Sequence, residues 1–147
     1  MCTNVQYKCC HRFIMNPQHL YFDPIRREQV VGYRQEKTMN MNDMQSCIDA
    51  CNKCYQTCLQ TAMNHCLDTG GRHVEPAHFR LMMNCAQICQ TSVDLQLSGS
   101  AFCAKYCALC AEICEACADS CAELDQMGDC EKVCRDCANS CRAMANQ

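Results

Sequence analysis

The sequence predicts an all-α fold, an antiparallel up-down-up-down four-helix bundle with a cysteine-lined core. Seventeen of the 20 cysteines lie within residues 47–141, and nearly all are three or four residues from the next. Side chains at these spacings return to one face of a helix. Short breaks that contain Gly or Ser divide this region into four segments. Because such connections are short, neighbouring helices must run antiparallel.

By its length the chain forms a single domain, which we expect to be preceded by an extension. Residues 42–147 are predicted to form the Cys-rich bundle and residues 1–41 an N-terminal extension. The extension contains Pro17, Pro24 and Gly32 and shows no periodic pattern. Its cysteines, which lack helical spacing, are Cys2, Cys9 and Cys10.

The first helix is expected to begin near Asn42 or Asp43, since either residue is a good N-cap. It is expected to run to about Asp68, where the TGG sequence at 69–71 stops it. It carries the first row of thiols, which are Cys47, Cys51, Cys54 and Cys58, with Cys66 beyond them.

The second helix is expected to open at Glu75-Pro76, because proline is tolerated in the first turn, and to end near Leu97. Its only thiols are Cys85 and Cys89. After the break at 98–100, Ser100 is predicted to cap the third helix, which is expected to run to about Met127. The third row of thiols comprises Cys103, Cys107, Cys110, Cys114, Cys117 and Cys121.

The fourth helix is expected to run from Cys130 to about Met144, after a turn at Gly128 and Asp129. Its row of thiols comprises Cys130, Cys134, Cys137 and Cys141. The sequences CIDACNKCYQTC, CAKYCALCAEICEACADSC and CEKVCRDCANSC are similar to one another. Their likeness indicates duplication of one Cys-rich helical unit.

Composition argues against several classes of partner. The net charge of −3 disfavours nucleic acid and anionic membrane surfaces. No apolar run approaches the ~20 residues of a membrane span. The N-terminal sequence MCTNVQYKCCHRF lacks a basic segment followed by an apolar one. We therefore expect a cytoplasmic protein, in a reducing compartment where dense cysteine indicates metal more often than disulfides.

Disulfides, zinc and iron–sulfur clusters are the first alternatives for so many thiols. A disulfide within one helix closes almost no loop and stabilises little. Structural zinc sites are usually isolated sets of four ligands, often with two-residue gaps, whereas three-residue gaps dominate here. Zinc buffering stays open as an alternative. Iron–sulfur binding is disfavoured because the C-x2-C-x2-C-x3-C-P run is absent.

Copper(I) fits the pattern best, because soft thiolate and thioether ligands select it. Two cysteines four residues apart on one helix can hold the same ion, and bridging thiolates can link ions along the bundle axis. Capacity is then on the order of one ion per thiolate. A thiol redox enzyme would need one activated cysteine in a distinctive setting. We therefore expect a binding protein and not an enzyme, with a thiol-redox buffer or a metal-sensing module as the alternative.

The repeated units also resemble a known family. CIDACNKCYQTC and CAKYCALCAEICEACADSC look like the helices of bacterial copper storage proteins, and the resemblance covers about residues 43–145. It implies a four-helix bundle whose core holds multiple Cu(I) ions. The absence of a leader resembles the cytosolic branch of that family. The resemblance further implies a homo-oligomer, a tetramer, whose contacts would cover flanking residues such as Tyr55, Phe79 and Phe102.

The candidate metal ligands are the seventeen bundle cysteines and three residues at one bundle end. Met82 and His78 precede Cys85 on the same helical face, and His65 follows Cys58 at heptad spacing. Met44, Met144 and His73 are weaker candidates of the same kind. We expect the end that carries His65, His78 and Met82 to admit the metal. The full set is Cys47, Cys51, Cys54, Cys58, Cys66, Cys85, Cys89, Cys103, Cys107, Cys110, Cys114, Cys117, Cys121, Cys130, Cys134, Cys137, Cys141, His65, His78 and Met82.

Overall fold

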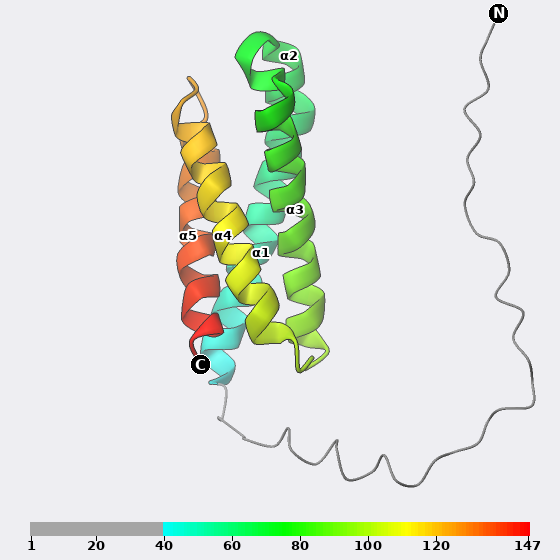
Figure 1. The fold of residues 1–147 in the computed structure, drawn as a ribbon, viewed down its shortest axis with the longest axis vertical. Coiled ribbons are helices and arrows are strands. Elements are labelled where there is room, and N and C mark those ends of the chain that lie inside the picture. Colours follow the sequence, from blue (N-terminus) through cyan, green and yellow to red (C-terminus); the bar gives the residue numbers. More distant parts are fainter. Residues whose placement is uncertain (1–39) are drawn as a thin grey trace, which may run out of the picture. The chain divides into compact units, whose positions relative to one another are not determined.

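Four helical arms pack as an antiparallel bundle in a computed structural model, which describes residues 40–147 (Figure 1). The predicted all-α fold class is confirmed. The predicted extension at 1–41, with Cys2, Cys9 and Cys10, lies almost wholly outside the described residues, so the division of the chain stays a prediction. The elements are α1 (Met41–Gln60), the π-helix η3 (Thr61–Cys66), α2 (Leu67–Thr69), the 3-10 helix η4 (Gly71–Val74), α3 (Pro76–Leu97), α4 (Cys103–Ala122) and α5 (Gly128–Ala145).

The first arm begins earlier than predicted. The side chain of Asn40 accepts a hydrogen bond of 3.0 Å from the backbone N–H of Asn42. Asn40 is therefore the N-cap, and the prediction of Asn42 or Asp43 in this role was wrong. The arm ends at Thr69, as the TGG sequence predicted.

The π-helix η3 interrupts this arm, which the sequence had predicted to be a regular helix. Cys58, Ala62 and Cys66 are all fully buried, yet they are separated by two consecutive steps of four. In an α-helix of 3.6 residues per turn, such steps rotate away from the core-facing side. A π-helix bonds i to i+5 and holds more residues in each turn, so η3 keeps Cys66 facing the core.

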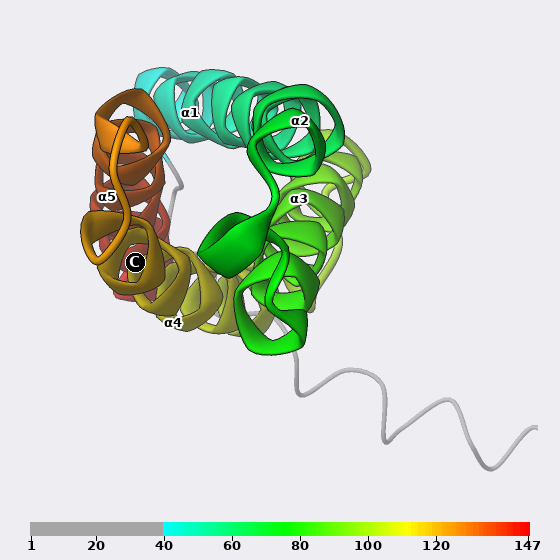
Figure 2. The ribbon, with the colours of Figure 1, turned by 90° about the horizontal axis from the view of Figure 1, so that it is seen from above.

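The connection from α2 to α3 crosses the end of the bundle (Figure 2). Gly70 and Gly71 have φ values of +67° and +55°, a left-handed conformation that glycine adopts without steric cost. On the far side, an Arg72 N–H donates to the carbonyl of Glu123 at 3.3 Å. η4 is thereby held across the bundle end.

The last two helices differ from prediction at the turn between them. α4 ends at Ala122 and not near Met127, and α5 begins at Gly128 and not at Cys130. The connection includes Gln126 with φ +61°, and Met127 is buried with 1% of its surface exposed. The second helix has the predicted bounds, with Pro76 in its first turn.

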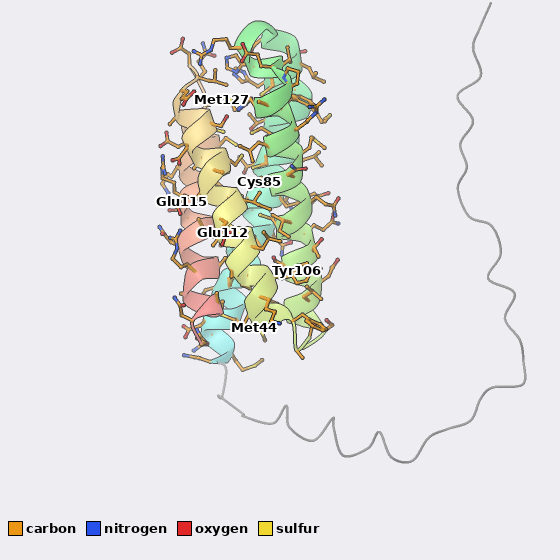
Figure 3. The ribbon with its side chains drawn as sticks, in the orientation of Figure 1. Met44, Cys85, Tyr106, Glu112, Glu115 and Met127 are labelled. Atoms are coloured by element: carbon orange, nitrogen blue, oxygen red, sulfur yellow. The ribbon has the colours of Figure 1, made fainter. Side chains whose placement is uncertain are left out.

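The four arms surround one core. In sequence around the axis they run α1, α3, α4, α5, and each packs against the next (Figure 2). Cys85 points inward at mid-height, whereas Glu112 and Glu115 project from the outer face of α4 (Figure 3). Glu115 pairs with Arg142 of α5, and both side chains are about half exposed. Such surface pairs stabilise a fold little, so interior packing must hold the arms together.

Thiols supply most of that interior. Besides the cysteines, the largest fully buried side chains are Met82, Met127 and Gln96. A buried thiol behaves as a small hydrophobe, but removal from water disfavours its charged form. Burial accordingly raises the pKa of Cys66 and of Cys103 above the usual value of 9.0.

These features predict that the metal-free protein folds and that its stability falls in alkali. Reduced, chelator-treated protein should give a strongly helical circular dichroism spectrum at pH 7. Above about pH 9, the unfolded chain loses thiol protons that folded Cys66 and Cys103 retain. Stability is therefore fully present below that pH and is lost as the pH rises through the raised pKa values. The melting temperature should decrease from about pH 8 to about pH 10.

The control for this experiment is a variant with Cys2, Cys9 and Cys10 changed to Ser, which should show the same decrease. A random-coil spectrum at pH 7 would contradict a preformed bundle. A melting temperature insensitive to alkali would contradict the protonated state of the buried thiols.

Candidate metal centre

All seventeen cysteines of the bundle are free and buried, and each exposes 4% of its surface or less. They come from all four arms, and α4 alone provides six. We call this set the sulfur column. Each row reaches the core because its three- and four-residue steps follow one helical face. A metal ion can therefore reach the column only through the ends of the bundle or by local opening.

The sulfurs are spaced as ligands of shared metal ions would be. Across helices, Cys58 and Cys134 are 3.4 Å apart, and Cys85 and Cys114 are 3.6 Å apart. A metal about 2.3 Å from each sulfur would separate two ligands by roughly 3.8 Å in a tetrahedral site and roughly 4.0 Å in a trigonal one. The metal-free column thus needs little rearrangement to bind ions.

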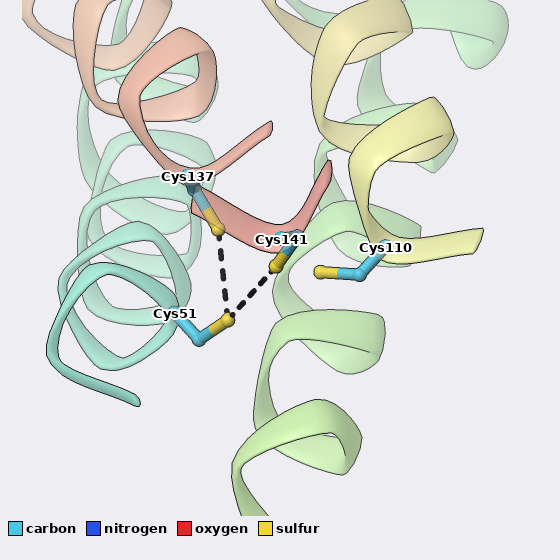
Figure 4. A group of neighbouring side chains, drawn as sticks. All are labelled: Cys51, Cys110, Cys137 and Cys141. Atoms are coloured by element: carbon cyan, nitrogen blue, oxygen red, sulfur yellow. Dashed lines mark hydrogen bonds between the residues drawn. The ribbon is translucent and has the colours of Figure 1, made fainter. Parts of the chain in front are cut away.

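One part of the column shows how three helices converge (Figure 4). The Sγ atom of Cys51 on α1 lies 3.3 Å from that of Cys141 and 3.7 Å from that of Cys137, both on α5. Cys110 of α4 faces the same space. These four sulfurs all lie within 4.8 Å of one another.

Four sets of four sulfurs and one set of three occur among the described residues, and these five sets overlap. Cys54, for example, belongs to two of them. Closed structural zinc sites use separate ligand sets, whereas ions that share bridging thiolates need overlapping ones. The sets are Cys51/Cys110/Cys137/Cys141, Cys54/Cys58/Cys85/Cys134, Cys54/Cys85/Cys89/Cys114, Cys89/Cys110/Cys114/Cys137 and Cys47/Cys107/Cys141.

Neighbouring thiols and burial raise the pKa of several cysteines in the column, among them Cys85, Cys89 and Cys134. Interactions with Cys110, Cys114 and Cys137, together with burial, raise the pKa of Cys89. Its sulfur lies 3.4 Å from that of Cys114. Since thiolates are the ligand form, metal binding must displace the thiol protons. Each bound cation also offsets the charge of the thiolates around it.

Met82 takes the place of a thiol at one end of the column. It is fully buried, and its Sδ atom accepts hydrogen bonds from three thiols, those of Cys117 at 3.7 Å, Cys121 at 3.6 Å and Cys130 at 3.8 Å. A thioether is a soft, uncharged ligand. The structure thus brings this sequence-predicted residue together with three predicted thiols.

Three histidines lie at the same end. The rings of His65 and His73 make an edge-to-face contact with centroids 5.1 Å apart. His78 is buried, and its Nδ1 lies 2.8 Å from Ser120 Oγ. Within the described residues, His65 Nε2, His73 Nδ1 and His78 Nε2 are buried without a hydrogen-bond partner. Burial lowers the pKa of His78, which favours the neutral imidazole that binds metals.

We call this the histidine end, defined by His65, His73, His78 and Met82. Cys66 is fully buried there, but it belongs to none of the five ligand sets. The histidines likewise belong to none of the five ligand sets. Of the predicted site residues, Cys66, His65 and His78 are therefore near the column without being part of these ligand sets.

The opposite end, which we call the Met144 end, carries other residues. Met144 and Cys103 are buried, and Met44 is partly buried against the core. Met44 lies toward this end and Met127 toward the histidine end (Figure 3). The Cys103 thiol lies 3.9 Å from that of Cys107.

Three buried residues were missed in the sequence. Met127 is buried beside the turn into α5, where no helical spacing marked it. Ser92 and Gln96, 1% and 2% exposed, continue the core-facing side of α3 beyond Cys89. The helical spacing could have identified them, since Ser92 lies three residues after Cys89 and Gln96 lies four residues after Ser92.

Comparisons with known proteins place these features in context. A crystal structure of the Nmul_A1745 protein from Nitrosospira multiformis is 61% identical, with a TM-score of 0.72, and the match covers 73% of this chain and 98% of that one. Cu(I)-bound copper storage protein BsCsp3 is 37% identical, with a TM-score of 0.65 and 70% and 98% coverage. Apo copper storage protein 3 from Bacillus subtilis is 39% identical, with a TM-score of 0.59 and 69% and 97% coverage.

A comparison with curated protein sequences found no match. Among the described helices, none combines the length and the apolar character needed to cross a membrane. The family described as copper storage protein matches residues 38–146, which span the whole sulfur column and both of its ends. The chain belongs to the copper storage protein family.

Proposed function

We propose that this protein binds and stores multiple Cu(I) ions in the sulfur column. The observation that carries the proposal is the overlap of the five ligand sets, in which Cys54, Cys85 and Cys89 each belong to two sets. Shared thiolates suit Cu(I), which accepts soft sulfur ligands. The Cu(I)-bound relative BsCsp3 supports the choice of metal.

Storage rather than catalysis follows from the redundancy of the ligands. Seventeen buried thiols in one interior give no single cysteine a distinctive, accessible setting of the kind that reactive cysteines need. A metal sensor would need few ligands, so redundancy also argues against the sensing alternative. We place the protein in the cytoplasm, because free thiols persist in a reducing compartment.

We propose that Cu(I) enters at the histidine end. The unpartnered nitrogens of His65, His73 and His78 are available as ligands, and Met82 contacts the first thiols of the column. Imidazole and thioether carry no charge and so attract Cu(I) less than thiolates do, which favours transfer inward. η4 crosses this end (Figure 2), so an entering ion passes beside His73.

We propose that the protein assembles as a homotetramer through the outer face of α4. Phe102, Tyr106 and Leu109 are 58%, 38% and 43% exposed, and their spacing places them along one side of the helix. Beside them, Tyr106, Ile88 and Ile113 help to line a shallow pocket of about 330 Å³ between α3 and α4. Tyr55 and Phe79, which the sequence had also suggested for this role, lie on α1 and α3 and are partly buried against the core.

The storage proposal predicts that capacity depends on α4. Changing Cys107, Cys110, Cys114 and Cys117 to Ser should lower Cu(I) capacity by roughly four equivalents, if each thiolate accounts for about one ion. Capacity is measured by titrating reduced protein with Cu(I) in the presence of a chromophoric chelator. Circular dichroism should stay helical, and the corresponding Ala variant separates loss of ligands from the effect of buried hydroxyls.

The matched control changes Cys2, Cys9 and Cys10 to Ser, which should leave capacity unchanged. If the unmodified protein saturates at one or two ions, the storage proposal fails and a sensing module becomes the better reading. An equal loss from the control variant would contradict the assignment of storage to the bundle at 42–147.

The entrance proposal predicts slower loading without loss of capacity. A variant with His65 and His78 changed to Ala and Met82 to Leu should load and release Cu(I) more slowly in stopped-flow measurements, while final capacity changes by about one ion or less. A Met44→Leu, Met144→Leu variant is the control at the other end. Unchanged rates in the triple variant, with slower rates in the control, would move the entrance to the Met144 end.

The assembly proposal predicts a particle of about four times 16.6 kDa in light scattering at micromolar concentrations. Changing Tyr106 and Leu109 to Glu should dissociate it, because burying unpaired charge in an interface is costly. The same change at exposed Met63 and Leu67, 40% and 53% exposed, serves as the control. A monomeric mass for the unmodified protein would refute the proposal.

A further inference from the structure

One face of α3 changes from sulfur to oxygen along its length. At successive turns it presents Met82, Cys85, Cys89, Ser92 and Gln96 to the core, and all of them are 2% exposed or less. α3 therefore contributes two thiols at mid-height but a hydroxyl and an amide toward the Met144 end. Each polar side chain is placed where the other arms supply sulfur.

The register of α3 and α4 fixes the layer to which Ser92 belongs. Cys89 lies 3.8 Å from Cys110 and 3.4 Å from Cys114. Because the two helices are antiparallel, one turn forward from Cys89 to Ser92 corresponds to one turn back from Cys110 to Cys107. Ser92 is thus level with Cys107 and occupies the α3 position of that layer.

The other three positions of this layer are thiols that already form a ligand set. Cys47, Cys107 and Cys141 lie within 4.8 Å of one another, and the sulfurs of Cys47 and Cys141 are 3.6 Å apart. Three thiolates around one Cu(I) carry a net charge of −2 in a buried site. A nearby donor hydrogen would offset this charge, since charge-assisted hydrogen bonds are the strong ones.

The hydroxyl of Ser92 is an uncommitted donor. Among the described residues, Ser92 Oγ has no hydrogen-bond partner although the side chain is 99% buried. Gln96 Nε2 donates to the backbone carbonyl of Ser92 at 3.2 Å and leaves that hydroxyl free. A buried polar group without a partner destabilises the protein, so the metal-free fold is less stable with Ser92 than it would be with an apolar residue.

The hydroxyl of Ser92 could act on this layer as a metal ligand or as a hydrogen-bond donor. An oxygen is a poor ligand for Cu(I), which leaves hydrogen bonding as the chemistry that Ser92 can supply.

We propose that Ser92 donates a hydrogen bond to the thiolates of a three-cysteine Cu(I) site formed by Cys47, Cys107 and Cys141. This proposal rests on the proposed storage function and deepens it. Ser92 stabilises the charged, metal-bound layer, and its unpartnered hydroxyl destabilises the metal-free fold. This layer differs from the layers nearer the histidine end, in which α3 supplies Cys85 or Cys89 as a further thiolate.

The test uses the full chain with Ser92→Ala. Removing the unpartnered hydroxyl should raise the melting temperature of the metal-free protein by about 3 °C. The same variant should hold about one Cu(I) ion roughly tenfold more weakly in competition with a chelator, because hydrogen bonds to charged groups contribute that much or more. A residue with only a packing role would not produce these opposite changes.

Two further variants make the result specific. Ser92→Cys should add about one equivalent of Cu(I) capacity, because it supplies the missing thiolate. Ser46→Ala removes an exposed hydroxyl that donates to the Asn42 carbonyl, and it should change neither the melting temperature nor the affinity in this way. In a Cys107→Ser background, the effect of Ser92→Ala on Cu(I) affinity should disappear.

Unchanged Cu(I) affinity in Ser92→Ala, or a lowered melting temperature of the metal-free variant, would overturn the proposal. These outcomes differ from failure of the storage function, in which the unmodified protein itself would bind only one or two ions. Affinity loss that persists in the Cys107→Ser background would also overturn it, since the donor would then act elsewhere.

Discussion

The close approach of thiol to thiol is the constraint on which the rest of the structure depends. Sulfurs from different arms, such as those of Cys51 and Cys141, are only 3.3 Å apart, so the four helices must lie close together. Alanines such as Ala62 and Ala118, both fully buried, let the backbones approach. Met82 and Met127 are buried toward the histidine end, where their flexible side chains fill the interior.

The two ends of the bundle differ in the side chains that lie beside the thiols. At the histidine end, uncharged imidazoles and a thioether lie next to the first thiols. At the Met144 end, Ser92 and Gln96 interrupt the thiol face of α3. If Cu(I) enters at the histidine end, as we propose, the column loads from an end with uncharged ligands toward an end where α3 carries oxygen groups in place of thiols.

Much of this architecture could be predicted from the sequence, because the cysteines mark helical faces directly. The three- and four-residue steps located all four arms, and the glycines at 70 and 71 located the first connection. Met82 and His78 could be chosen as candidates because they are in phase with Cys85, and both are buried in the structure. These features depend on the spacing of residues along the chain, which can be read directly from the sequence.

The parts that could not be predicted depend on contacts across the fold. The π-helix η3 exists because Cys66 must face a core whose position the other arms determine. The early end of α4 depends on Gln126 and Met127 forming the turn into α5. The role of Ser92 emerges only when Cys47, Cys107 and Cys141 are seen on three other sides of the same layer.

Because the ligand sets share cysteines, the loss of a shared cysteine such as Cys54 affects two sets without abolishing either. If Cys54 were lost to oxidation or mutation, Cys58, Cys85 and Cys134 would remain as one group of three sulfurs, and Cys85, Cys89 and Cys114 as another. Each group still suffices for a three-coordinate ion. Loss of one ligand therefore lowers the total capacity but leaves groups of sulfurs that can still bind Cu(I).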